Sequence, residues 1–140
     1  MSSTVADILN DLRETLAGAG DFSAVLVAPV GDSTYWPRAE LTLSGLDPRP
    51  ADDRPGGHWT TIRARVCIHV RDADPAARLV RALELAEAAG TALLADRFRG
   101  QRCRDLPTGK ATEIGPARVE PPVKAPYLAL SFEVRCNFES

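Results

Sequence analysis

The most restrictive feature of this chain is the stretch 59–71, WTTIRARVCIHVR, in which apolar and polar side chains alternate. Strict alternation places successive side chains on opposite faces of a β-strand. The apolar face would carry Ile62, Ala64, Val66, Ile68 and Val70, and the polar face would carry Thr61, Arg63, Arg65, Cys67 and His69. Such a strand fits a sheet with one covered and one open face, which is common in antiparallel sheets.

A second strand of the same type is predicted at 126–138, PYLALSFEVRCNF. Its apolar face would carry Leu128, Leu130, Phe132, Val134, Cys136 and Phe138, and its polar face would carry Ala129, Ser131, Glu133, Arg135 and Asn137. The sequence ends two residues after this stretch. We therefore expect the strand to be paired inside the sheet and not to hang loose.

Three shorter stretches are also predicted as strands. Residues 22–28 are short and apolar, and residues 38–45 alternate with Ala39, Leu41 and Leu43 on one side. Residues 111–120 are interrupted at Gly115–Pro116. Proline cannot donate to a strand ladder, so this interruption predicts an edge position or a bulge.

An amphipathic helix is predicted over residues 4–17. Its apolar positions recur at helical spacing, and they are Val5, Ile8, Leu9, Leu12 and Leu16. Thr4 and Asp7 have the spacing of a capping box. The stripe could pack on the sheet of its own chain or on a neighbouring copy.

A second helix is predicted from Asp74–Pro75 to about Asp96, because aspartate is a good N-cap and proline fits the first helical position. Its expected inward stripe is Leu79, Leu83, Ala86, Gly90, Leu93 and Leu94, and its expected solvent side is Arg78, Arg81, Glu84 and Glu87. Glycine lowers helix propensity by about 1 kcal/mol. We therefore expect Gly90 to permit a close approach of this helix to the sheet.

The element order is α-β-β-β-α-β-β, without strict alternation of helices and strands. This order predicts an α+β fold in a single domain over residues 1–140, with a mostly antiparallel sheet of about five strands and two helices on one face. The helices would leave the polar face of the sheet uncovered.

Composition excludes some classes of function. The net charge is −2, so no general attraction to nucleic acid or to an anionic membrane is expected. No apolar run reaches the roughly 18–20 residues of a membrane helix. The first residues lack the basic and apolar regions of a signal peptide, so we expect a cytoplasmic location.

The sequence predicts neither catalytic residues nor a bound cofactor or metal. It contains no nucleophile elbow, zincin motif, P-loop or dinucleotide fingerprint. Asp52–Asp53 sits beside Arg54, which favours a solvated loop over an acid–base pair. Cys67 and His69 share a strand face, but a structural zinc ion needs three or four converging ligands. The three cysteines are expected to be reduced thiols.

Three loops are the candidates for contacts with partners. Residues 47–58, DPRPADDRPGGH, are expected to form a long proline-stiffened loop that reaches a neighbouring subunit or another protein, so deletion of 49–56 should spare the fold and impair assembly. The loop at 31–37 has aromatics that could form a contact patch or fold back on the core. The basic stretch 97–110 could be a protein contact, a solvated connector or an arm that contacts nucleic acid. The candidate interface residues are Tyr35, Trp36, Arg49, Asp52, Asp53, Arg54, Arg63, Arg65, Arg97, Arg99, Arg102 and Arg104.

The chain resembles the tail terminator, or tail completion, proteins of long-tailed bacteriophages and phage-derived particles. The resemblance covers roughly 1–138 and rests on element order, on the strand TTIRARVCIHV, on the helix DADPAARLVRALELAEAAG and on the last strand YLALSFEVRCNF. No single motif in it is diagnostic, and no functional residue is carried over.

The resemblance implies a non-enzymatic structural protein that forms a ring, typically a hexamer. Such a ring caps the tail tube, ends its polymerisation and joins the tail to the head-side connector. The implied partners are other copies of the chain, the tail tube protein, the connector protein and DNA that passes through without sequence-specific contact. The implied location is the host cytoplasm during assembly and then the neck of the particle.

Two other classes of function remain open. One is a small adaptor or ligand-binding α+β domain that uses the polar sheet face. The other is an enzyme that acts on an anionic substrate through Arg63, Arg65, His69 and Arg135. The enzyme requires a concave pocket with a shifted pKa for His69. The ring predicts no such pocket and predicts that Arg63 and the loops are buried by another copy.

Overall fold

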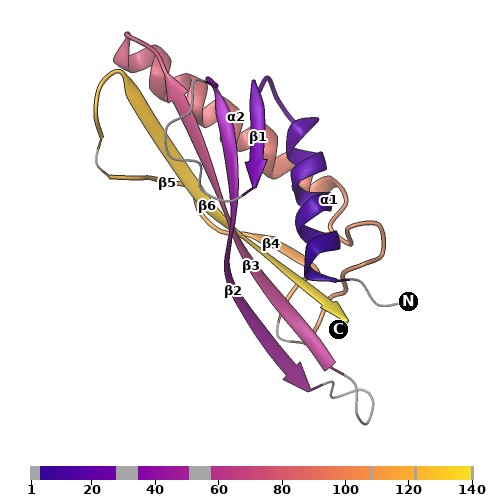
Figure 1. The fold of residues 1–140 in the computed structure, drawn as a ribbon. Helices are drawn as coiled ribbons and strands as arrows, with labels where there is room; N and C mark the ends of the chain where they lie inside the picture. Colours follow the sequence, from indigo (N-terminus) through magenta and orange to yellow (C-terminus); the bar gives the residue numbers. More distant parts are fainter. Residues whose placement is uncertain (1–3, 28–34, 51–57, 108, 122, 140) are drawn as a thin grey trace.

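The computed structural model describes residues 4–27, 35–50, 58–107, 109–121 and 123–139. The helices are α1 (Val5–Ala17) and α2 (Pro75–Ala95), and the strands are β1 (Ala24–Val27), β2 (Arg38–Pro50), β3 (His58–Arg71), β4 (Thr112–Ile114), β5 (Arg118–Val119) and β6 (Tyr127–Glu139). The α+β class predicted from the sequence is confirmed, with six strands in place of about five (Figure 1).

The sheet is mixed and mostly antiparallel. Its order is β1-β2-β3-β6-β4, and β5 also pairs with β6. Within this sheet, β1 runs parallel to its neighbour β2, and the other described pairs are antiparallel. The two long strands β3 and β6 pair along their whole length, which confirms the prediction that the last strand lies inside the sheet. Gly115–Pro116 separates β4 from β5, so the predicted interruption lies at an edge of the sheet.

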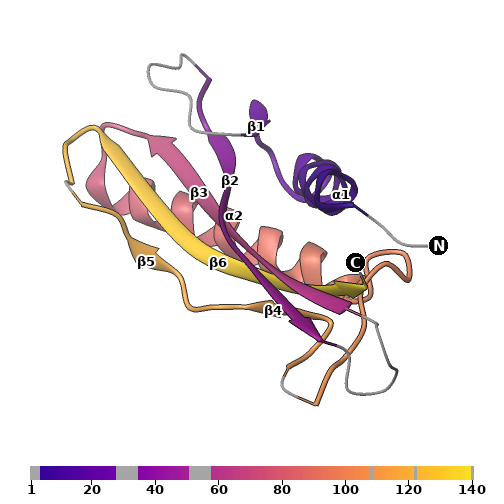
Figure 2. The ribbon, with the colours of Figure 1, turned by 60° about the horizontal axis from the view of Figure 1, so that its bottom comes forward.

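Both helices cover the same face of the sheet, as predicted (Figures 1 and 2). The alternation in β3 and β6 places their apolar residues under the helices, where Ile62, Val66 and Val134 are fully buried. Ile8, Leu12 and Leu16 of α1 complete this core. Thr4 and Asp7 form the capping box, with the Asp7 amide donating to Thr4 Oγ1 at 3.1 Å. The stripe of α1 therefore packs on its own chain.

The predicted rotation of α2 is wrong for most of its inward stripe: Leu93 is buried as predicted, but Arg78, predicted on the solvent side, is buried as well. The buried residues are Arg78, Ala82, Leu85, Ala89 and Leu93, whereas Leu79, Leu83 and Leu94 are 44%, 50% and 48% exposed. Apolar residues occupy two adjacent stripes of this helix, so periodicity alone did not select the one that packs. A Cβ added at Gly90 would meet no neighbouring group within 4 Å, so the predicted close approach there is also wrong.

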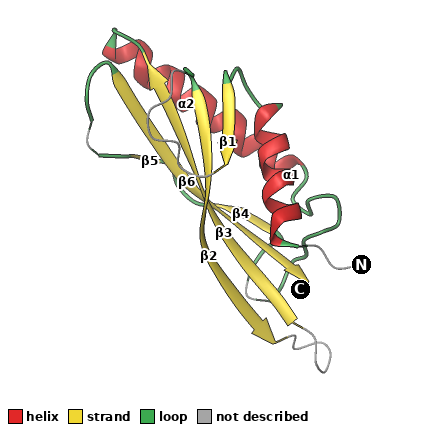
Figure 3. Cartoon of the chain, viewed as in Figure 1, coloured by secondary structure: helices red, strands yellow, loops and turns green. Residues whose placement is uncertain are grey.

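The predicted loop 47–58 is partly strand. β2 continues to Pro50 and pairs residue by residue with β3 down to Pro50–His58, which leaves 51–57 outside the described residues. A bulge between Leu43 and Gly45 keeps the apolar residues of β2 on the helix side across the irregularity. Figure 3 shows the ends of β2 and β3 projecting beyond both helices. We call residues 42–50 and 58–63 the hairpin arm; its β3 strand stays paired with β6 as far as Trp59–Glu139, and the outer edge of its β2 strand is unpaired among the described residues.

Candidate functional site

The open face of the sheet carries charged side chains that are paired with one another. Arg63 lies 2.8 Å from Asp47, Arg65 lies 2.6 Å from Glu120, and Arg135 lies 3.3 Å from Glu133. The arginines on this face that we expected to meet a partner are therefore already neutralised within the chain. The charges of Arg63, Arg65 and Arg135 are thus balanced, and an ion-paired arginine attracts the phosphate backbone of a nucleic acid less than an unpaired one does.

A second chain of polar contacts lies where β2 meets β3. The Arg38 Nε atom donates to Glu40 at 3.0 Å, and the other oxygen of Glu40 lies 3.1 Å from His69 Nε2. Arg38 and Glu40 are 5% and 8% exposed, so this pair is buried. The register Arg38–His69 and Glu40–Cys67 brings these side chains together. The sequence pointed to His69 but not to its partner Glu40.

A cavity of about 330 Å³ adjoins these residues. It is lined by Arg65, Cys67, His69, Glu120, Pro121, Tyr127, Leu128 and Ala129. Burial, and then the positive charge of Arg38, lowers the pKa of His69. The enzyme hypothesis required such a pocket, and the expectation that this face would lack one is wrong.

The groups in this cavity are not arranged for nucleophilic catalysis. Burial raises the pKa of the Cys67 thiol to about 11, so the thiolate is scarce at neutral pH. The Ser131 hydroxyl donates to Glu120, and this bond, with help from Arg65, lowers the pKa of that carboxyl. Among the described residues, no three His, Cys, Asp or Glu side chains gather as metal ligands. Cys136 cannot join Cys67 and His69, because it faces the core beside Thr112.

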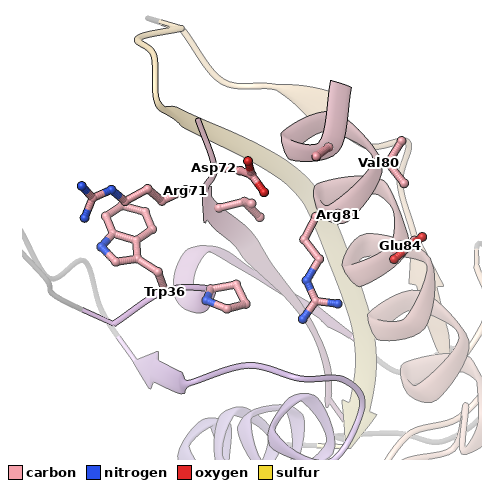
Figure 4. Close-up of a pocket in the computed structure, with 9 residues that line it drawn as sticks. Trp36, Arg71, Asp72, Val80, Arg81 and Glu84 are labelled. Carbon is pink, nitrogen blue, oxygen red and sulfur yellow. The ribbon is translucent and has the colours of Figure 1, made fainter. Parts of the chain in front are cut away.

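A second cavity, of about 380 Å³, lies between the start of β2 and the first turns of α2 (Figure 4). Trp36 and Arg71 flank it on the sheet side, while Val80, Arg81 and Glu84 flank it on the helix side. Trp36 stacks on Tyr127 with ring centroids 5.1 Å apart. Of the two predicted loop aromatics, Trp36 thus folds back onto the sheet and Tyr35 is 53% exposed.

The basic connector after α2 is held mainly by contacts within the chain. Arg99 is 1% exposed, and its guanidinium reaches the Asp96 carbonyl at 2.8 Å, Thr15 Oγ1 at 3.2 Å and the Asp11 carboxylate at 3.4 Å. An interface role expected for Arg99 does not fit this burial. Arg97 pairs with Asp105 at 3.0 Å and lies over the ring of Phe98.

The remaining predicted interface residues lie in different places. Arg102 is exposed and donates to the Arg99 carbonyl at 3.1 Å, and Arg104 lies over the Trp59 ring at the hairpin arm. Arg49 belongs to β2 and pairs in the ladder with Trp59. The predicted interface residues Asp52, Asp53 and Arg54 lie outside the described residues. The structure therefore does not bring the predicted residues that it describes together into one site.

One surface was missed by the sequence analysis. An apolar groove with a cavity of about 440 Å³ runs between α2 and the β4 edge, lined by Leu83, Ala86, Glu87, Ile114, Gly115, Ala117 and Phe132. Leu83 and Ala86, which were assigned to the inward stripe of α2, form its helical wall. In the sequence, the groove was indicated by the second apolar stripe of α2, which does not pack in the core.

These features define a class: an α+β protein with a one-sided mixed sheet, a projecting hairpin arm and an open face of paired charges. No protein-family model and no curated protein matches the sequence. Among solved structures it is similar to a chain of the "Virion of native gene transfer agent (GTA) particle", at 16% identity and a TM-score of 0.44, over 92% of this chain and 84% of that chain. No helix within the described ranges is long and apolar enough to span a bilayer.

Proposed function

We propose that this chain is a structural component of a phage or phage-like particle that forms a ring on the end of the tail tube. The ring ends polymerisation of the tube and provides the surface that joins it to the head-side connector. The proposal rests on the resemblance to tail terminator proteins in element order. The proposal includes a ring of six copies, with the tube protein and the connector protein as partners and with DNA passing through the lumen.

The observation that carries the proposal is the hairpin arm. The arm extends the β2–β3 ladder past the helices, and among the described residues no strand lies beside its outer edge from Thr42 to Pro50 (Figure 3). An unpaired edge on a projecting hairpin is a surface for protein contact, not for turnover of a small substrate. Residues 51–57, with Pro55 and three charged side chains, join the two strands of this arm.

The charge-paired face supports the same function. DNA that passes through a ring must not be held by the wall. A lumen lined by neutralised arginines offers few unpaired cations for phosphate, so it would bind DNA weakly and without base contacts. The paired residues Arg63, Arg65 and Arg135 are candidates for such a lining.

The experiment that tests this function is negative-stain imaging of particles assembled without this chain. Tails of uncontrolled length, unattached to heads, are the expected result, and supply of the wild-type chain should restore defined tails. Tails of normal length joined to heads in the absence of the chain would contradict the proposal.

A second candidate, a small ligand-binding domain, is favoured by the cavity beside His69. It offers an arginine, a histidine and a glutamate around about 330 Å³ of space, the lower end of the size of ligand sites. Ligand binding raises the unfolding temperature by mass action. A dose-dependent rise with inorganic phosphate that is lost in Arg65→Gln would support this candidate, and no rise would remove phosphate from consideration.

A further inference from the structure

Two of the three cysteines lie side by side in the core. Cys103 belongs to the basic connector after α2, residues 97–110, and forms an isolated bridge with Phe138 near the end of β6 (Figure 2). Cys136 lies two residues before Phe138 in β6, so its side chain points to the same, core-facing side of the strand. Cys103 and Cys136 are 1% and 0% exposed, and both are free thiols. The structure therefore holds a buried, reduced pair of cysteines.

A hydrogen bond joins the two sulfurs and gives them different roles. The Cys103 thiol donates to the Cys136 sulfur, and this bond is the main cause that raises the pKa of Cys103 and lowers the pKa of Cys136. The positive charge of Arg99 also lowers the pKa of Cys136, against the opposing effect of burial. Cys136 is therefore the sulfur that loses its proton more readily, and a thiolate is the nucleophilic form of cysteine.

The basic connector is held to β6 loosely enough for the sulfurs to approach further. Among the described residues, Cys103 meets β6 through its single bridge and through the adjacent Arg104 amide, which donates to the Asn137 carbonyl at 3.0 Å. A continuous ladder, such as the one between β3 and β6, would fix the position of Cys103 more firmly. Two sulfurs in contact need only a small shift to reach the bonded distance of about 2 Å.

We propose that Cys103 and Cys136 form an oxidation site, at which hydrogen peroxide links them in a disulfide. The Cys136 thiolate attacks one oxygen of the peroxide and the O–O bond breaks. This step leaves a sulfenic acid on Cys136 and releases hydroxide, which takes up a proton to give water. The Cys103 sulfur then attacks the sulfenic sulfur, and the hydroxyl group leaves with the Cys103 proton as a second water. Each sulfur is oxidised by one electron, and the peroxide is reduced to water.

The disulfide would fasten the basic connector to the last strand. It closes the loop from residue 103 to residue 136 and so restricts the unfolded chain. The connector is already joined to α1, because Arg99 lies 3.4 Å from Asp11. Cytoplasmic thiols are kept reduced, whereas a particle that has left the cell meets oxidants. The inference uses the proposed place in a particle only for this timing, since the chemistry of the pair does not depend on a ring.

Peptide mapping of the purified full chain tests the site. The chain is treated with hydrogen peroxide, the remaining thiols are alkylated in denaturant, and the protein is cut with trypsin. Cleavage after Arg102 and Arg135 places Cys103 and Cys136 on separate peptides, so a covalent pair of these peptides identifies the disulfide. Cys67 is the internal control: burial raises the pKa of its thiol to about 11, so it should remain free and be alkylated.

Thermal unfolding measures the consequence of the bond. The oxidised wild-type chain should unfold roughly 5–15 °C above the reduced chain. Cys103→Ala should abolish this gain, and Cys67→Ala, the matched control, should retain it. Peroxide treatment that leaves Cys103 and Cys136 free, a linkage that includes Cys67, or an oxidised wild-type chain no more stable than the reduced one would overturn the inference. The peptide map of the wild type decides the linkage whether or not Cys103→Ala folds, and the imaging of tails tests the proposed function separately.

Discussion

At the scale of single residues, Arg99 shows that a charged side chain in a basic stretch can belong to the core. Five cations in residues 97–110 predicted a surface for contact. Arg99 instead turns inward, from a backbone with φ of 49°, and joins the connector to α1 through Thr15 and Asp11. The sequence could not reveal this, because Thr15 lies 84 positions away along the chain and Asp11 lies farther still.

The role of Arg99 predicts a large loss of stability on its removal. Arg99→Ala should lower the free energy of unfolding by about 2–3 kcal/mol, because it removes the buried guanidinium that pairs with Asp11 and donates to Thr15 and to the Asp96 carbonyl. Urea unfolding measures the change. Arg97→Ala is the matched control: Arg97 is half-exposed and paired with Asp105, so its loss should cost no more than about 1 kcal/mol. Equal effects of the two changes would contradict the structural role of Arg99.

His69 predicts a dependence of stability on pH. Burial lowers its pKa in the folded chain, so the unfolded chain binds more protons between that lowered pKa and the ordinary value of about 6.5. The free energy of unfolding should therefore fall as the pH drops below about 6.5, and it should regain this contribution above that pH. Urea unfolding at several pH values should show a shallower decline for His69→Gln than for the wild type. Parallel curves would show that His69 is not the group responsible.

At the scale of elements, the sequence correctly predicted the buried faces of those elements whose apolar residues follow one dominant period. The alternation in β3 and β6 and the stripe of α1 determined their buried faces, because each has one apolar side. The predictions for two elements were wrong, for opposite reasons. α2 has more apolar residues than its packed face needs, so its rotation depended on where β4 and α1 lie. In residues 47–50, Pro48 and Pro50 led to the prediction of a loop where the chain forms a strand. Prolines are tolerated there because this part of β2 lies at an edge, where no neighbouring strand needs the missing N–H.

The corrected rotation of α2 can be tested with two leucines of one helix. Leu85 is 2% exposed and packs in the core, whereas Leu83 faces the groove. Leu85→Ala should lower the free energy of unfolding by about 2–5 kcal/mol because it leaves a cavity. Leu83→Ala should change it by no more than about 0.5 kcal/mol. Chemical unfolding of both variants decides between the rotations, and the reverse order of effects would restore the stripe read from periodicity.

At the scale of the whole molecule, the candidate contact surfaces are those that the core does not cover: the open sheet face, the hairpin arm and the groove beside α2. The sequence identified the open face and the segment beyond Pro50, because polar and proline-rich patterns are visible along the chain. It missed the groove, which is formed jointly by α2, β4 and β6 and has no contiguous motif. The pairing of acids with the arginines of the open face was also hidden, since it depends on strand register.

Residues 51–57 follow the last ladder pair of the hairpin arm, Pro50–His58, so we expect shortening them to affect assembly and to spare the fold. Replacing residues 51–57 by Asn-Gly closes the hairpin with a two-residue turn next to the last ladder pair, Pro50–His58. The core contacts are unchanged, so the unfolding temperature should stay within a few degrees of the wild type. Assembly of defined tails in particles supplied only with this variant should be impaired, because the arm loses the charged segment with Pro55 that joins its strands.

The matched control for this shortening replaces the seven residues 51–57 by a Gly/Ser segment of equal length, which separates the length of the segment from its chemistry. Impaired tails with the short turn alone would show that length matters. Impaired tails with both variants would show that Pro55 and the charges matter as well, since the Gly/Ser segment keeps the length but is flexible and uncharged. Normal tails with both variants, or unfolding of the shortened chain, would contradict a role of this segment in assembly.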